Sequence, residues 1–119
     1  MSTFQIPSDK PLPILARVTS SAVATIVDGT DSVYFVPWFQ VNVHSNITDN
    51  LTVDLYDGTN AHYLAHDEGS TWNARAVAPF GSYQFSNGII VPKSWKLRVT
   101  AANASGLVHV IGLKIKVVT

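Results

Sequence analysis

Apolar and polar residues alternate along several stretches of this sequence, and this period of two constrains the fold more than any other feature. In FQVNVH, which begins at Phe39, every second residue is apolar. LTVDLY from Leu51, WKLRVT from Trp95 and IGLKIKV from Ile111 follow the same pattern. Successive side chains of a β-strand point to opposite faces, so each stretch predicts a strand with one buried face.

Residue pairs typical of turns separate these stretches at short intervals, among them Asp28-Gly29, Asp57-Gly58 and Asn87-Gly88. They divide the chain into about eight short strands, with no convincing long helix between them. We expect these strands near residues 14–19, 22–27, 33–45, 51–56, 71–78, 82–86, 89–91 with 95–101, and 107–117. The predicted fold is therefore all-β, an antiparallel β-sandwich or jelly roll.

The first residues differ from the rest because three prolines lie close together there, namely Pro7, Pro11 and Pro13. Proline fixes φ and lacks an N–H, so residues 1–13 are predicted to form an extended N-terminal arm and residues 14–119 a single β-sandwich domain. The arm is either a frayed terminus or a segment whose Phe4 and Ile6 dock on a neighbouring subunit.

Pro37 lies inside the third predicted strand. Because proline cannot donate to a sheet ladder, we expect it at a sheet edge or at a β-bulge. It should split Val33–Val36 from Trp38–Ser45.

The tripeptide Asp-Gly-Thr follows an apolar strand twice, at Asp28–Thr30 and at Asp57–Thr59. A repeat protein needs at least three units, and no third copy occurs in the sequence. We interpret the two copies as one turn solution used twice.

Charged residues make up only 13% of the chain, against roughly 25% in an average soluble domain. The three tryptophans, four tyrosines and five phenylalanines of such a chain suggest surface that is buried against other subunits. Eight basic and eight acidic residues balance, so no field attracts nucleic acid or anionic lipid. No stretch has the ~20 apolar residues of a membrane span, no signal peptide is recognisable, and the absence of cysteine favours folding inside the cell.

The segment HYLAHDEG, from His62 to Gly69, places two histidines four residues apart. On a helix His62 and His66 would share a face, as in helical zinc proteases, but Tyr63 stands where that motif needs its glutamate. On a strand they would lie ~13 Å apart, too far for two bonds of ~2 Å to one metal ion. We therefore predict no metal site and interpret the segment as a polar connection between sheets.

Other signs of catalysis are equally weak. The sequence has neither a G-x-S-x-G motif nor a cysteine nucleophile, and it has no glycine-rich phosphate loop. The acidic residues Asp54, Asp57, Asp67 and Glu68 fall in turns or in positions that look exposed, where a carboxylate stays simply ionised. His44 and His109 stand alone in strand patterns. We predict that the protein is not an enzyme, with no catalytic residue and no cofactor.

From about Thr19 to the end, the order of features resembles small β-sandwich accessory proteins of tailed bacteriophage virions. The likeness rests on VTSSAVATIVDGT, on VNVHSNITDNLTVDLYDGT and on GSYQFSNGIIVPKSWKLRVTAANASGLVHVIGLKI. It implies a non-enzymatic capsid decoration (cement) protein, which binds the major capsid protein as a homotrimer. Such a protein is made in the host cytoplasm and is located on the capsid surface of the virion.

Under this interpretation the interface is expected on the arm and on aromatic residues of loops: Phe4, Ile6, Pro7, Leu12, Trp38, Trp72, Phe80 and Tyr83. The alternative function is a carbohydrate- or receptor-binding module of a phage head fibre or tail. Tryptophan faces can stack on sugar rings, and three tryptophans occur at positions 38, 72 and 95. Their more common use is in a core or a subunit contact, because aromatic residues supply much of the area buried there.

Overall fold

The computed structural model describes residues 11–18, 23–64, 75–102 and 107–117. These residues form β-strands and no α-helix, and none of the described segments is a helix able to cross a membrane. The strands are β1 (Leu12–Val18), β2 (Val23–Asp28), β3 (Val33–Val43), β4 (Asp49–Tyr56), β5 (Ala61–Tyr63), β6 (Arg75–Val77), β7 (Ser82–Phe85), β8 (Ile89–Val91), β9 (Lys96–Ala101) and β10 (Val108–Val117).

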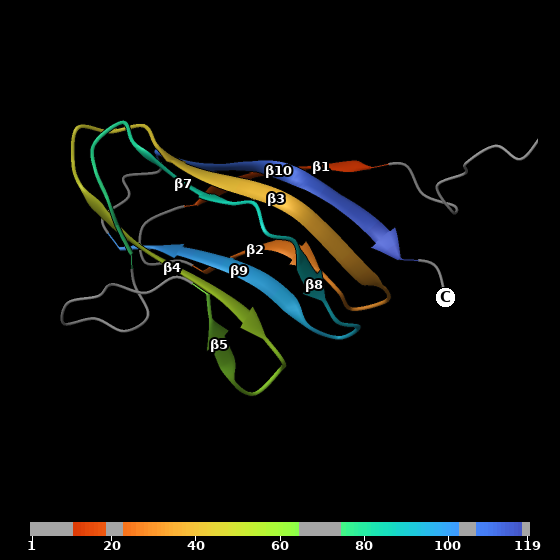
Figure 1. The fold of residues 1–119 in the computed structure, drawn as a ribbon. Helices are drawn as coiled ribbons and strands as arrows, with labels where there is room; N and C mark the ends of the chain where they lie inside the picture. Colours follow the sequence, from red (N-terminus) through yellow and green to blue (C-terminus); the bar gives the residue numbers. More distant parts are fainter. Residues whose placement is uncertain (1–10, 19–22, 65–74, 103–106, 118–119) are drawn as a thin grey trace, which may run out of the picture.

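The strands form two antiparallel sheets, which lie one above the other in Figure 1. Sheet A has the order β1-β10-β3-β7, with β8 also paired to β3. Sheet B has the order β2-β9-β4-β5, with β6 also paired to β4. The all-β, two-sheet architecture predicted from the alternation is therefore confirmed.

The core lies between the two sheets and is made almost entirely of aliphatic side chains. In β9 the buried Leu97, Val99 and Ala101 alternate with half-buried residues, as the sequence pattern predicts. Phe39 of β3 is fully buried, and its ring stacks on Phe85 of β7 with 4.5 Å between centroids. The alternation thus identifies the buried face of β4, of β9 and of the second half of β3 correctly, but not that of β10, where Val108 and Val110 are buried and Ile111 is exposed.

Pro37 lies at a β-bulge inside sheet A. Leu113 of β10 pairs with Trp38 of β3, but Ile115 pairs with Phe35, so Val36 and Pro37 together face one residue of β10. On the opposite side of β3, β8 pairs with residues 34–36 and β7 with residues 39–42. The prediction of a bulge is confirmed, but the predicted split of the strand at Pro37 is wrong. The strand continues as Val33–Val43 because no neighbour pairs with Pro37 on either side.

A second bulge explains a break in the alternation of β2. Thr25 pairs with Arg98 and Val27 with Leu97, which leaves Ile26 as the extra residue. As a result Ile26 and Val27 are both buried although they are neighbours in the sequence.

The observed strands differ from the predicted ones in three main ways. The first strand begins at Leu12, two residues early, because Leu12 and Pro13 pair with β10. Residues 61–63 form β5, a strand that the sequence did not predict, because its pairing with β4 depends on the four-residue turn between them. Residues 89–91 and 96–101, predicted together as one strand, are separate strands in different sheets, β8 and β9. With β5 this gives ten strands within the described ranges instead of about eight.

Gly112 allows β10 and β3 to lie close together at the centre of sheet A. A Cβ atom at this position would lie 2.7 Å from both the Phe39 Cβ and the Trp38 carbonyl oxygen. We expect Gly112→Ala to lower the free energy of unfolding by about 2 kcal/mol, because backbone atoms would have to move to relieve the contact. Urea denaturation followed by tryptophan fluorescence measures this, and an unchanged midpoint would contradict it.

Candidate functional site

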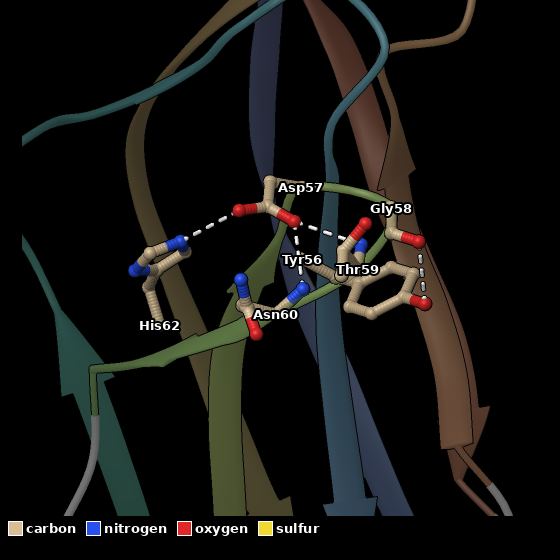
Figure 2. A network of polar contacts seen from close by, with 6 residues as sticks. All are labelled: Tyr56, Asp57, Gly58, Thr59, Asn60 and His62. Carbon is tan, nitrogen blue, oxygen red and sulfur yellow. Dashed lines mark hydrogen bonds and ion pairs between the residues drawn. The ribbon is translucent and has the colours of Figure 1, made fainter.

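The HYLAHDEG segment begins in a polar network around Asp57, drawn in Figure 2. His62 is in β5, and its Nε2 lies 3.0 Å from Asp57 Oδ2. The imidazole also stacks on Trp95, with 5.2 Å between ring centroids. His62 therefore belongs to a strand and not to a helix, and its carboxylate and aromatic partners hold it in one orientation.

Asp57 also closes the turn between β4 and β5. Its Oδ1 accepts hydrogen bonds from the backbone N–H groups of Thr59 at 2.8 Å and Asn60 at 2.7 Å (Figure 2). The N–H of Asn60, the side chain of His62 and the N–H of Thr59 lower the pKa of Asp57 to about 2, because each stabilises the ionised carboxylate. Gly58 has a φ of 102°, a conformation that only glycine adopts without strain.

The other Asp-Gly-Thr turn uses the same hydrogen bond but a different property of glycine. Asp28 Oδ1 accepts from the N–H of Thr30 at 2.9 Å, and the Thr30 hydroxyl and N–H lower the pKa of Asp28. A Cβ on Gly29 would lie 2.6 Å from the carbonyl oxygens of Pro92 and Trp95, so glycine is needed there for close approach. The two turns therefore share the hydrogen bond that the aspartate accepts, as predicted, but they need glycine for different reasons.

Within the described residues no group of three or more histidine or acidic side chains could hold a metal ion. His66, Asp67 and Glu68 lie outside these residues. The described part of HYLAHDEG thus has one histidine bonded to one carboxylate, an arrangement that stabilises a hairpin.

Asp54 corrects an expectation, because it was predicted to be exposed and is only 3% exposed. It lies opposite Arg98 on the outer face of sheet B, and Arg98 Nε donates to its Oδ1 at 2.8 Å. The guanidinium of Arg98 also lies 3.9 Å from the ring centre of Tyr56. Arg98 and its neighbours cover the carboxylate, which explains the burial of an acidic residue on an outer face.

Phe80 is the most unusual residue among the exposed aromatic ones. It is 72% exposed, and it has a φ of 55°, which is strained for any residue with a side chain. The N–H of Gly81 donates to the carbonyl of Ala78 at 2.9 Å, so Phe80 is the third residue of a tight turn that begins Ala78-Pro79. Glycine or asparagine normally takes this place in a type II turn.

Two further exposed apolar side chains lie nearby in the hydrogen-bonding pattern: Ile47 in a loop bonded to this turn, and Leu107 on a segment bonded to the residue before that loop. The N–H of Phe80 donates to Ser45 in the loop that contains Ile47, and the N–H of His44 donates to Leu107. Ile47 is 51% and Leu107 37% exposed. We call Phe80, Ile47 and Leu107 the apolar tip; the loop after β3 and the turn before β7 lie together at the left end of the sandwich in Figure 1.

A second exposed apolar region covers the outer face of sheet A. Cross-strand pairs on this face join Leu15 to Ile111, Leu113 to Trp38, and Phe35 to both Ile115 and Ile90. Leu15 is 76% exposed, Ile90 51% and Ile111 38%, and the other members are half-buried. We call these seven residues the sheet A face.

The structure distributes the predicted interface residues over separate places. Phe4, Ile6, Pro7 and Trp72 lie outside the described residues. Phe80 is in the apolar tip, while Leu12 begins β1 at the opposite end of sheet A. Trp38 and Tyr83 were predicted in loops but lie in β3 and β7, where Trp38 belongs to the sheet A face and Tyr83 packs against the core beside Phe85.

The tryptophans do not form a common platform within the described part of the chain. Trp38 lies on the outer face of sheet A, while Trp95 packs against the core and is stacked on His62. The exposure of Leu15, Ile90 and Ile111 on the surface was not predicted from the sequence. Ile90 was not distinguished from its buried neighbour Val91, and the alternation of β10 was taken to bury Ile111, because which face of a strand lies outside depends on the opposite sheet.

Comparisons of the chain with protein-family models, with curated proteins and with solved structures found no match.

The strain at Phe80 predicts an unusual stability effect. We expect Phe80→Gly to raise the free energy of unfolding by about 1 kcal/mol, because glycine adopts a positive φ without strain. Phe80→Ala removes the same ring but keeps the Cβ, so it should not stabilise the fold. Urea denaturation of both variants measures the difference, and equal midpoints would contradict backbone strain at this residue.

Asp57 predicts a pH dependence of stability. Its pKa is lowered from 3.8 to about 2 in the folded chain, so its contribution is present above pH 4 and is lost as the pH falls through about 2. Asp57→Asn keeps an oxygen for the turn but cannot ionise. We expect the gap in unfolding free energy between wild type and this variant to shrink between pH 4 and pH 2, as measured by urea denaturation at each pH. A constant gap would show that the carboxylate charge is unimportant.

Proposed function

We propose that the protein is a non-enzymatic structural protein of a bacteriophage virion, a decoration protein that binds the capsid surface as a homotrimer. The virion and trimer parts of this proposal come from the sequence resemblance described above. The structural observation that carries it is Phe80, a large aromatic side chain exposed to solvent in a strained turn.

We infer that the domain is a jelly roll. Along the chain β1, β3, β7, β8 and β10 belong to one sheet, and β2, β4, β5, β6 and β9 to the other, so the chain crosses repeatedly between sheets. If β5 with β6, and β7 with β8, each count as one interrupted strand, the ten strands occupy eight positions. This arrangement matches the eight-strand jelly roll, which occurs in viral capsid and lectin domains.

Backbone strain of this kind persists where the surrounding structure imposes it, and it is found mainly at binding sites. At Phe80 the imposing contacts are the hydrogen bonds to Ser45 and from Gly81 to Ala78. They fix the backbone that presents the exposed ring, so little backbone entropy is lost when the ring enters a pocket of a partner. Aromatic anchors of this type supply much of the affinity in protein interfaces.

A capsid offers many copies of one pocket, which suits a small binding tip. Three tips joined in a trimer would bind together, and avidity would then exceed the affinity of a single contact by a large factor. The proline-rich segment before β1 is part of the proposal as a second capsid contact; of the predicted arm, Leu12 and Pro13 belong to β1. With its low charge, the protein would rely on shape and apolar contact in place of electrostatic attraction.

The proposal predicts that Phe80→Ser weakens binding to capsids about tenfold or more per tip, because truncating a central aromatic anchor costs about 2 kcal/mol. The measurement is co-sedimentation of purified protein with capsids that lack it, taken from the phage that encodes it. Val23→Ser is the matched control, since Val23 is 53% exposed but lies in β2 of the other sheet and is not one of the three residues of the tip. Wild-type protein that does not sediment with capsids would contradict the proposed function.

A further inference from the structure

We propose that a second copy of this chain packs on the sheet A face. The inference deepens the proposed function and rests on it, because it names the surface by which the subunits of the decoration protein associate. It starts from the cross-strand apolar pairs of this face, which form three rows across β1, β10, β3 and β8.

The charge of this face is low enough for identical copies to meet. Among the described residues that point outward from sheet A, Arg17 carries the one permanent charge, and it lies at the β1 edge opposite His109. Gln40 and Asn42 of β3 supply polar groups and bond to each other at 2.6 Å. Two such faces neither repel strongly nor bury an unpaired charge at their centres.

The size of the face also suits association. Four strands at about 4.8 Å and the ten residues of β10 at about 3.3 Å give a face of roughly 19 by 33 Å, or about 600 Å². Side-chain relief adds to this projected area, and a stable interface buries about 800 Å² per partner. The whole face is therefore close in size to one side of a stable interface, and an arrangement that uses half of it for each neighbour needs further contacts.

The strand edges are less suitable for self-association, which leaves the face. In β1, Pro13 lacks an N–H, and in β2 the bulge at Ile26 distorts the edge. The remaining edge strands are short, with three residues in β5, β6 and β8 and four in β7. Such edges disfavour the addition of strands from another chain.

In a three-fold arrangement the half of the face on β1 and β10 would pack on the half on β3 and β8 of the next copy. Leu15 and Ile111 of one subunit then lie against the rows of Phe35 and Trp38 in another. Sheets packed face to face lie about 10 Å apart, a distance that such side chains fill.

The test compares solution masses by light scattering coupled to gel filtration. Wild type is expected at a multiple of 12.9 kDa. Leu15→Glu is expected to raise the concentration at which the oligomer dissociates by on the order of a hundredfold, since it would bury an unpaired charge in the interface. Val23→Glu adds the same charge to an exposed strand residue of sheet B and should leave the mass unchanged.

Two results would overturn the inference: a wild-type mass of 12.9 kDa at every concentration, or an oligomer that resists Leu15→Glu and Ile111→Glu alike. Circular dichroism confirms that each variant is folded. Phe80→Ser separates the inference from the proposed function, because it should weaken capsid binding while the mass is unchanged. An oligomer that depends on Leu15 but never binds capsids would support packing of a second copy on the sheet A face, and it would contradict the proposed capsid role.

Discussion

The central constraint in this structure is the pairing of β3 with three other strands around a proline. An eleven-residue strand in the middle of a sheet needs partners on both sides, yet Pro37 cannot donate a hydrogen bond. Both demands are satisfied at Pro37. On one side of β3, the pairing partner changes there from β8 to β7. On the other side, the bulge in the pairing with β10 falls at the same place. Gly112 lies just beyond the bulge and allows β10 to stay close to Phe39. The register of sheet A, and with it the identity of every outward residue, follows from this arrangement.

Much of this fold could be predicted because alternation is a local property. β4, β9 and β10 were recognised from their own residues, and the bulge was inferred from one proline. β5 and the bulge at Ile26 could not be found in this way, because β5 depends on the turn that pairs it with β4 and the bulge depends on pairing with the distant β9. The same holds for Asp54, whose burial results from Arg98, a residue 44 positions away in the sequence.

The candidate site was predictable only in part. Phe80 was recognised as a surface aromatic residue near turn signals, but the adjacent Gly81 is the residue that would be expected to take the positive φ. Placing Phe80 there depends on the hydrogen bond to Ser45 in another loop, which no pattern in the sequence indicates. The sheet A face was missed for a different reason. An apolar residue on the outer side of a strand reads as core until the position of the second sheet is known, as Ile111 illustrates.

The apolar tip and the sheet A face belong to different parts of the molecule, and this separation has a physical advantage. The tip is formed by loops at one end, so its contacts can change without altering the pairing of strands. The face is formed by side chains of paired strands, whose spacing is fixed by backbone hydrogen bonds, so it presents a rigid surface that loses little entropy on association. A protein with both can associate through one surface and bind a partner through the other. Because the two surfaces share no residue, substitutions in one should leave the energetics of the other nearly unchanged.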